Sequence, residues 1–202
     1  MSLWRGKSPL ILASQSRARQ ALLSDAGIEF QAIAAELDER AVQQASGVSA
    51  PDAIAALLAR EKALVVSNNQ PGRFVIGADQ TLALGSRLFS KPASRARAAE
   101  QLRALAGQSH ELHSAVAVAR DGKILFEGVA SARMTMRQLG ETEIEAYLDA
   151  AGNAVTSSVG AYQLEGLGIH LFERIEGDHF TILGLPLLQL LAFLRSEGLL
   201  AV

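Results

Sequence analysis

The chain has 202 residues, of which 49% are hydrophobic and 20% charged, and its formal net charge at pH 7 is -2. These values are typical of a soluble globular protein that is long enough to bury a substantial core. The near-neutral charge provides no broad basic surface, so we expect no nucleic acid partner. An anionic ligand would have to be met by a local cluster of cations.

The sequence contains no cysteine. This excludes disulfides, thiolate metal sites and cysteine nucleophiles, and it is consistent with a reducing cytoplasm. The apolar run after the basic residues near the N-terminus is too short for the core of a signal peptide, and no segment reaches the length of a membrane span. We therefore expect a cytoplasmic protein without a membrane partner.

The first part of the chain alternates short apolar runs with helical patterns. Residues 10–13 predict a short buried strand, and a helix with a serine cap follows it. Residues 28–33 predict a second strand that leads into an acidic turn at 36–39. A proline at the first helical position predicts a helix over about residues 51–67. Its helical wheel predicts an apolar stripe of Ile54, Leu57, Leu58, Leu64 and Val65, with Glu61 near the centre and Lys62 on the flank.

The second part begins with an apolar strand over residues 73–85, RFVIGADQTLALG. A loop at Lys91 and Pro92 separates it from an alanine-rich helix over 94–106. Asp121-Gly122 is a strong hairpin signal and predicts two long strands, over residues 109–120 and 123–136.

The last third is less regular. We expect a short helix over residues 141–150, then strands and turns punctuated by glycine over 155–183. Pro186 at a first helical position predicts the closing helix. Because helices and strands alternate around one long hairpin and no linker interrupts them, we expect a single α/β domain over residues 1–202, with a mixed sheet and helices on its faces.

Asp79 and Gln80 interrupt the apolar run of residues 73–85, where a buried strand would be expected to carry valine. A carboxylate in such a setting is costly unless a positive group lies against it. Four local features could supply or share that group.

The first feature is the turn SQSRAR, in which Ser14, Ser16 and Arg19 precede or open a helix. Hydroxyls, free helix amides and a guanidinium group suit a phosphate. A capped helix with a solvated basic first turn is the alternative.

The other three features are Lys62, Lys91 and Glu39. Lys62 lies beside the apolar stripe and could be the cation that pairs with Asp79. The alternative is a solvated salt bridge at the edge of the domain. Lys91 is fixed by Pro92, although most such lysines are simply solvated. Glu39 could hold a hard cation together with Asp79 through oxygen ligands, or it could face solvent.

Several other chemistries do not fit the sequence. His110 and His113 lie three apart in a predicted strand, so they point to opposite faces and cannot share a metal. The sequence has no GxSxG elbow and no GxxxxGK[ST] loop, and the glycines of GLGIH are too weak a signal for a dinucleotide site.

The ordered set LILASQSRARQALLSDAGIEF, ELDE, LAREKA, VIGADQTL, KP, VGAYQLEGLG and GLPL resembles the Maf (septum-formation) nucleotide pyrophosphatases. The resemblance covers about residues 10–198. It implies a two-lobed α/β fold like that of the inosine-triphosphate pyrophosphatases, with the active cleft between the lobes. It also implies hydrolysis of a nucleoside triphosphate to the monophosphate and pyrophosphate with a divalent metal, Mg²⁺ or Mn²⁺.

The resemblance also implies roles for individual residues. Asp79, Lys62 and Lys91 match the catalytic positions, and Glu39 and Asp79 match the metal ligands. Positions implied to contact the substrate are Ser14, Ser16, Ala18, Arg19, Gln80, Gln163 and Glu165.

Within the family, Gln80 and Glu165 resemble the branch that acts on 7-methyl-GTP, whereas the dTTP/UTP type has Thr and Gln at these positions. A carboxylate at 165 can accept hydrogen bonds from a guanine edge. Ala18 stands where the 7-methyl-GTP branch typically has Trp, so a dTTP/UTP-type enzyme is the alternative. The expected role is removal of modified nucleotides, a house-cleaning function.

Two further hypotheses remain: a nucleotide-sensing regulator of cell division that acts without catalysis, and a phosphatase that removes only the terminal phosphate. The resemblance also makes a homodimer possible, with the hairpin and the closing helix as candidate surfaces, although core packing explains the same residues.

Overall fold

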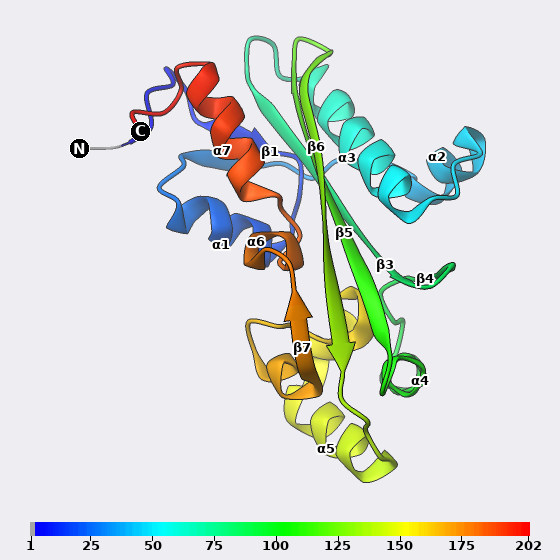
Figure 1. Ribbon diagram of the computed structural model, residues 1–202. Coiled ribbons are helices and arrows are strands. Elements are labelled where there is room, and N and C mark those ends of the chain that lie inside the picture. The colour runs from blue at the N-terminus through cyan, green and yellow to red at the C-terminus, as the bar shows by residue number, and fades with distance from the viewer. Residues whose placement is uncertain (1–2) are drawn as a thin grey trace.

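The computed structural model describes residues 3–202, which form a seven-stranded mixed sheet with helices on both faces (Figure 1). The strand order is β2-β1-β3-β5-β6-β7, and β4 pairs with β3. Strand β1 is parallel to β2 and β3, and the other pairs are antiparallel. The predicted α/β class with a mixed sheet and flanking helices is confirmed. None of the helices in this described part is long and apolar enough to cross a bilayer.

The strands are β1 (Leu10–Leu12), β2 (Phe30–Ala32), β3 (Val75–Leu84), β4 (Arg87–Phe89), β5 (Ser109–Arg120), β6 (Lys123–Met136) and β7 (Phe172–Glu176). The helices are α1 (Arg17–Asp25), α2 (Glu39–Ser46), α3 (Pro51–Ser67), α4 (Arg95–Leu105), α5 (Glu141–Ala151), α6 (His179–Ile182) and α7 (Leu187–Ser196). Three short 3₁₀ helices lie between α5 and β7: η1 (Gly152–Thr156), η2 (Val159–Ala161) and η3 (Leu167–Leu171).

The long hairpin β5-β6 has the predicted bounds. Asp121 and Gly122 both have positive φ, 51° and 70°, which is the geometry that a tight two-residue turn requires. Helix α3 also has the predicted bounds. In both cases the signal is local, a turn pair or a helix-initiating proline, so it needs no knowledge of tertiary contacts.

Three predictions about local structure were wrong. The predicted acidic turn leads directly into helix α2: its last residue, Glu39, is the first residue of the helix, and the Asp38 side chain caps the helix by accepting a hydrogen bond from Ala41 N. Residues 155–183 contain one strand, β7, and are otherwise 3₁₀ helices, turns and the short helix α6. Pro186 is the N-cap of α7 rather than its first residue.

The buried face of α3 also differs from the predicted stripe. Leu57, Leu64 and Val65 are only partly buried, as is Glu61. The face that packs on the sheet is formed largely by alanines, and the two sets that meet are Ala55, Ala59 and Ala63 on α3 and Ala115, Ala117 and Ala119 on β5. Small side chains let the helix approach the sheet closely, which a count of large apolar residues does not reveal.

Gly77 marks the closest approach of β3 to α3. A Cβ atom at this position would lie 2.0 Å from Ala59 O and 2.6 Å from Ala63 N. Both are backbone atoms of a packed helix, so neither can move away without displacing α3. Overpacking of this kind typically costs up to about 3 kcal/mol.

We therefore expect Gly77→Ala to lower the free energy of unfolding by about 3 kcal/mol, measured by urea denaturation. Gly140→Ala is the control, because its nearest neighbour would be 3.8 Å from the new Cβ, and it should cost much less. Equal losses in the two variants would contradict the proposed clash.

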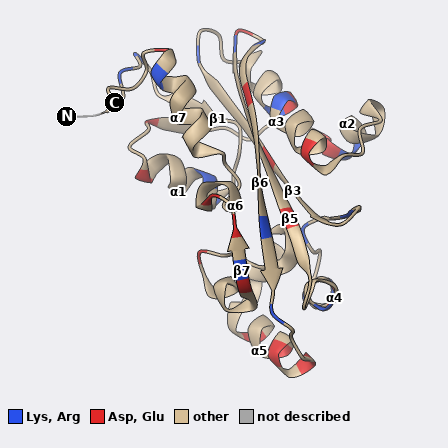
Figure 2. Ribbon diagram, viewed as in Figure 1, with Lys and Arg blue, Asp and Glu red and all other residues tan. Residues whose placement is uncertain are grey.

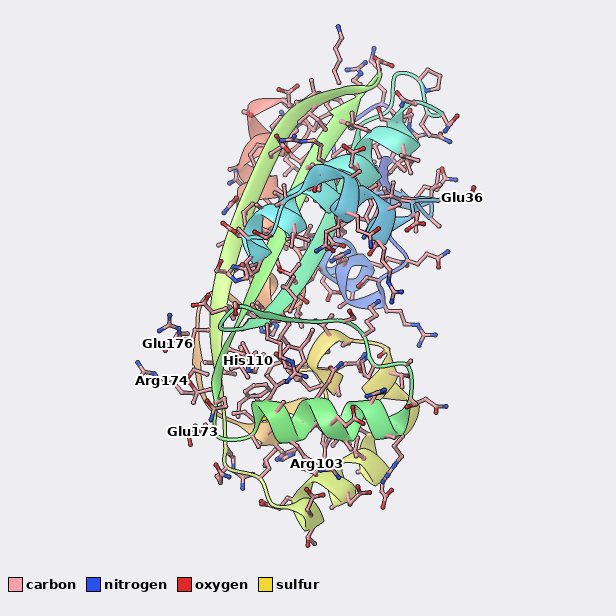
Figure 3. All side chains as sticks on the ribbon, turned by 90° about the vertical axis from the view of Figure 1, so that its right-hand side faces the viewer. Glu36, Arg103, His110, Glu173, Arg174 and Glu176 are labelled. Carbon is pink, nitrogen blue, oxygen red and sulfur yellow. The ribbon has the colours of Figure 1, made fainter. Side chains whose placement is uncertain are left out.

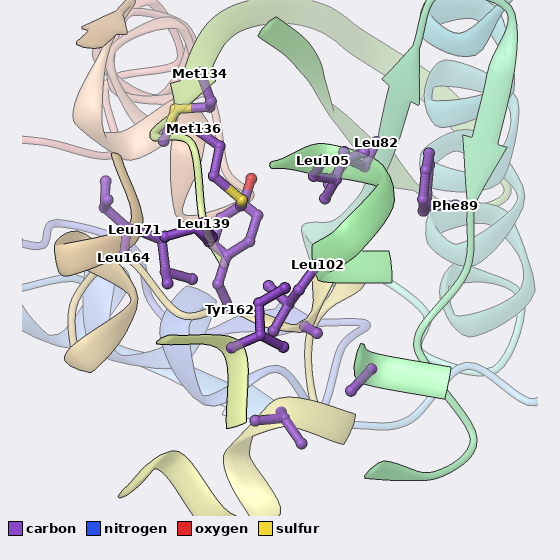
Figure 4. Close-up of a cluster of buried hydrophobic side chains, with 14 of the residues drawn as sticks. Leu82, Phe89, Leu102, Leu105, Met134, Met136, Leu139, Tyr162, Leu164 and Leu171 are labelled. Atoms are coloured by element: carbon purple, nitrogen blue, oxygen red, sulfur yellow. The ribbon is translucent and has the colours of Figure 1, made fainter. Parts of the chain in front are cut away.

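Two large apolar clusters pack against opposite ends of the long strands. One packs α1 and α7 against β1 and β3 and includes Leu12, Leu23 and Leu190. The other packs α4 and α5 against the far ends of β5 and β6; it includes Leu102, Met134 and Tyr162 (Figure 4). Each cluster fixes one end of the long strands. The division of the domain into two lobes with a cleft between them stays a prediction.

His110 lies inside the second cluster. It is almost fully buried, its side chain points into the protein interior (Figure 3), and its Nε2 is 2.7 Å from the Tyr162 hydroxyl oxygen. Burial lowers the pKa of His110 from the ordinary 6.5 to about 4. The unfolded chain therefore takes up a proton in this pH range that the folded chain does not.

Because the pKa of His110 is lower in the folded state, its contribution to stability is present above pH 6.5 and is lost as the pH falls towards 4. We expect this loss to be about 3 kcal/mol in the free energy of unfolding. Comparing urea denaturation at pH 7 and pH 4, His110→Gln should show a smaller loss than the wild type, whereas the exposed-site control His170→Gln should behave like the wild type. The prediction is wrong if His110→Gln keeps the full pH dependence.

Candidate active site

Strand β3 positions Asp79 through its alternation of faces. Gly77, Asp79 and Thr81 point towards α3: Gly77 meets Ala59 and Ala63, and the Thr81 hydroxyl donates to Pro51 O at 2.9 Å. Ala78 and Gln80 belong to the opposite face. The Asp79 side chain is 12% exposed, so it is largely buried but not sealed from solvent.

Lys62 supplies the positive charge that Asp79 requires. Its Nζ lies 2.5 Å from Asp79 Oδ1 and 2.7 Å from Glu39 Oε1. Lys62 comes from the middle of α3, and Glu39 is the first residue of α2. The Glu39 side chain is 50% exposed, so this group reaches solvent on its α2 side.

Arg19 belongs to α1 and reaches β3 from another direction than Lys62, which belongs to α3. Its guanidinium group donates from Nη1 to Ala78 O at 2.7 Å and to Ser14 Oγ at 3.2 Å, and from Nε to Gly184 O at 2.8 Å. Ser16 is the N-cap of α1 and accepts a hydrogen bond from Arg19 N. Strand β1 lies beside β3, so the turn from β1 into α1 brings these side chains to Asp79.

The charges of this group influence one another. Burial raises the pKa of Asp79, while the charges of Lys62 and Arg19 and the Lys62 hydrogen bond lower it, and the charge of Glu39 raises it. Burial also disfavours the charged form of Arg19 and so lowers its pKa, whereas the charges of Asp79 and Glu39 raise it. Two cations and two carboxylates from separate segments therefore form one electrostatic group.

Gln80 is directed away from Lys62. Its Nε2 lies 2.9 Å from Ser114 Oγ, 3.1 Å from Thr181 O and 3.0 Å from Ile182 O. Ala18 is half-buried in the first turn of α1.

The remaining candidates lie in other segments. Lys91 is exposed in the loop after β4, and Glu165 is exposed between η2 and η3. The Gln163 side chain donates to Ser157 Oγ at 3.0 Å within its own segment. Within residues 3–202, no hydrogen bond or ion pair joins Lys91, Gln163 or Glu165 to Asp79.

Two cavities lie elsewhere. One of about 370 Å³ lies along α2 and is lined by Arg40 and Gln44, among others. The other, of about 240 Å³, is lined mainly by α5 and η3. Tyr147 lines this second cavity, and burial raises its pKa to about 12, to which the charge of Glu165 adds. Neither of these two cavities is lined by Asp79.

Comparison with known proteins identifies the family. The family model described as "Maf-like protein" matches residues 9–197. The chain belongs to the Maf-like family. A protein of Bradyrhizobium diazoefficiens named nucleoside triphosphate pyrophosphatase is 74% identical over 202 residues, covering all of both chains. One of Rhodopseudomonas palustris with the same name is 69% identical over the same length, again covering all of both chains.

A more distant relative carries a narrower name. The 7-methyl-GTP pyrophosphatase of Brucella abortus is 52% identical over 191 residues, which cover 93% of this chain and 96% of the relative. The predicted membership of the Maf family is confirmed. The roles of individual residues stay predictions, because sequence identity to a relative over the whole chain does not show what one side chain does.

Glu39 and Asp79 are the residues of this Maf-like protein's candidate site that could hold a divalent cation. In residues 3–202 no cluster of three or more acidic or histidine side chains is arranged as a metal site. Glu39 and Asp79 nevertheless share one ammonium group, so their oxygens lie close together. Mg²⁺ is usually bound by one or two carboxylates plus substrate phosphates and water. Glu39 and Asp79 could supply the carboxylates.

The sequence placed Ser14 and Arg19 in one turn, but it did not reveal the other two groups that orient Arg19. They are the carbonyl oxygens of Ala78 and Gly184, and backbone carbonyls leave no mark in a side-chain pattern. Ser114 and Thr181 were also missed. The one available signal for this segment was GLPL, which begins at Gly184 and occurs in the family in this place.

Proposed function

We propose that this Maf-like protein hydrolyses a nucleoside triphosphate to the nucleoside monophosphate and pyrophosphate. The observation that carries the proposal is the convergence of Asp79, Lys62, Glu39 and Arg19 from β3, α3, α2 and α1. A polyphosphate needs several cations, and its hydrolysis needs a base for water, so this mixed group suits the reaction. The names of the relatives from Bradyrhizobium and Rhodopseudomonas support it.

In the proposed reaction, the oxygen of a water molecule forms a bond to the α-phosphorus. The bond from the α-phosphorus to the bridging oxygen breaks, and pyrophosphate leaves with the electron pair. Asp79 accepts the proton of the water, and the charges of Lys62 and Arg19 stabilise the phosphate oxygens. Mg²⁺ or Mn²⁺, held by Glu39 and Asp79, would neutralise charge on the phosphates.

The remaining candidates would complete the proposed site. Lys91 would bind the phosphates, and Ser14 and Ser16 would donate hydroxyl hydrogen bonds to them. Glu165, with Gln163, would meet the base. Because Lys91 and Glu165 are exposed, their side chains are free to turn towards a ligand.

For the base we propose 7-methylguanine. The relative from Brucella abortus supports this choice, and so does the carboxylate at 165, which can accept hydrogen bonds from the guanine edge. A dTTP/UTP-type preference is the alternative. Removal of the modified nucleotide would keep it out of nucleic acids, a role that we place in the cytoplasm.

The test is a panel of 7-methyl-GTP, GTP, dTTP, UTP and CTP assayed with Mg²⁺ or Mn²⁺ for pyrophosphate and orthophosphate separately. The proposal expects pyrophosphate, with the highest kcat/KM for 7-methyl-GTP. Release of orthophosphate alone would indicate a terminal phosphatase. No product from any of these nucleotides would contradict the enzymatic function and favour a nucleotide sensor.

A further inference from the structure

Gln101, in the middle of α4, joins two segments that carry candidate residues of the site. Its Nε2 donates to Ser90 O at 2.8 Å, and its Oε1 accepts a hydrogen bond from Gly160 N at 3.1 Å. Ser90 directly precedes Lys91 in the loop after β4, and Gly160 belongs to η2, which leads into the turn that carries Glu165. One side chain thus connects the loop of the proposed phosphate-binding lysine with the segment that precedes the proposed nucleobase-binding carboxylate.

The orientation of the Gln101 amide is determined by its two partners. Ser90 O is a carbonyl oxygen and can only accept, and Gly160 N can only donate. An amide turned the other way would bring its oxygen against Ser90 O and its NH₂ group against the Gly160 N–H, so both bonds would be lost. The link therefore needs a side chain that is a donor and an acceptor at once. A glutamate at 101 would keep the bond from Gly160 and lose the bond to Ser90.

The η2 end of this link is held in place by other contacts. Ala161 O accepts a hydrogen bond from the Tyr147 hydroxyl at 3.2 Å, and the Tyr162 hydroxyl oxygen lies 2.7 Å from His110 Nε2. Tyr147 belongs to α5 and His110 to β5, so two different elements hold this short stretch. Ala161 also has a φ of 63°, which is uncommon for a residue with a side chain and persists where the surroundings impose it. Segment 160–162 is therefore a fixed point of the molecule.

The loop end of the link has few other contacts. Within the described residues, the bond from Gln101 is the only hydrogen bond that residues 90–93 make, and Lys91 forms no ion pair. Pro92 is buried, so packing fixes the chain after Lys91, whereas the hydrogen bond from Gln101 fixes it before. The Lys91 side chain is exposed, and a lysine side chain is long and flexible, so its reach is defined only when its backbone is held.

We infer that Gln101 is a positioning residue: by holding Ser90 against the fixed segment 160–162, it sets the direction from which the Lys91 ammonium group meets the phosphates. This inference deepens the proposed function and rests on it, because Lys91 binds the phosphates only in that proposal. Gln101 acts through Lys91, so its effect is the same for every nucleotide.

The first test measures the loop in the absence of substrate. Gln101→Met removes both hydrogen bonds, and Gln101→Glu removes only the bond to Ser90; Gln, Met and Glu are all good helix formers, so α4 is kept. ¹⁵N relaxation gives the order parameter of the Lys91 amide, and hydrogen exchange reports the Gly160 amide. We expect the order parameter to fall from about 0.85 towards about 0.6 in both variants. Exchange at Gly160 should become roughly tenfold faster in Gln101→Met only.

Gln189→Met is the matched control. Gln189 also donates from Nε2 to a carbonyl oxygen, Val129 O at 3.2 Å, but it joins α7 to β6. It should leave the Lys91 order parameter and the Gly160 exchange unchanged. An unchanged order parameter of Lys91 in both Gln101 variants would overturn the inference. An equal fall in Gln189→Met would also overturn it, because the effect would then be a general loosening.

The second test is a double-mutant cycle in steady-state kinetics on the triphosphate panel. Gln101→Met should lower kcat/KM by roughly tenfold for every nucleotide, because a misplaced Lys91 no longer stabilises the phosphates. In the Lys91→Ala background, the same substitution should change kcat/KM by less than about twofold, since the group that it positions is absent. Gln101→Glu should behave like Gln101→Met in both backgrounds.

Two kinetic outcomes would contradict the inference. An equal loss in the Lys91→Ala background would show that Gln101 does not act through Lys91, and changed ratios of kcat/KM between nucleotides would place its effect at Glu165 instead. The two tests also separate this failure from that of the proposed function. If the wild type releases no pyrophosphate, the proposed function fails, and the NMR result alone decides whether Gln101 fixes the loop.

Discussion

Asp79→Asn is expected to lower kcat for pyrophosphate release by roughly 10³-fold or more without lowering the free energy of unfolding. The loss of turnover follows from the removal of the proposed base and metal ligand, and general base catalysis typically contributes 10²- to 10⁴-fold. The amide is close in size to the carboxylate, so it leaves the packing of β3 against α3 in place.

The effect on stability follows from the pKa of Asp79. Because burial raises the pKa of this carboxyl in the folded state, folding favours the protonated form. The stability that goes with protonation is present below the unfolded-state pKa and is lost as the pH rises through the folded-state pKa. A neutral amide avoids this loss, so at pH 7 Asp79→Asn should be at least as stable as the wild type, and the difference should disappear in acid.

Urea denaturation at pH 7 and pH 4 checks the stability, and product analysis with metal present checks the turnover. Asp25→Asn changes the same charge at an exposed position at the end of α1 and serves as control for both. Near-normal turnover in Asp79→Asn would remove Asp79 from the mechanism. A variant that binds nucleotide without turnover, and still gives the full cellular effect, would instead support the sensor hypothesis.

How much of this molecule could be predicted depends on where each signal lies. Helix α3 begins at Pro51 and the hairpin turns at Asp121-Gly122, so both were predicted to the residue from local chemistry. Helix α2 was missed because its cap, Asp38, was counted as one more acid of a solvent-exposed turn. The glycines of residues 155–183 were interpreted as breaks between strands, whereas the chain there winds through 3₁₀ turns.

The candidate site could be predicted only where a side chain of the sequence carries the signal. A carboxylate in an apolar strand requires a cation nearby, and Lys62 was among the few candidates. The ion pair between Lys62 and Asp79 agrees with that expectation, and the same Lys62 also pairs with Glu39. The contacts of Arg19 with Ala78 and Gly184 could not be predicted, because the acceptors are backbone carbonyl oxygens. The other charged residues are distributed over many elements with both signs mixed (Figure 2), which is consistent with a local cluster rather than a broad field.

The second large effect is expected at Lys62. Lys62→Met should lower kcat/KM by roughly 10²-fold or more, because a preorganised charge on the phosphates is lost. It should also raise the pKa of Asp79 further, since the charge and the hydrogen bond of Lys62 are among the causes that lower it. Glu39→Gln is the matched variant with the opposite sign: it removes a charge that raises the pKa of Asp79, so that pKa should fall.

Both shifts can be measured without turnover, by following the ¹³C signal of the Asp79 side-chain carboxyl against pH in metal-free and nucleotide-free protein. Arg19 stays in place in both variants, so its lowering contribution is common to them. The two variants must shift the titration of Asp79 in opposite directions from the wild type, since one removes a cation and the other an anion from the same ammonium-carboxylate group. Shifts in the same direction would mean that burial changes, rather than these two charges, control Asp79, and the proposed sharing of Lys62 between the carboxylates would then be wrong.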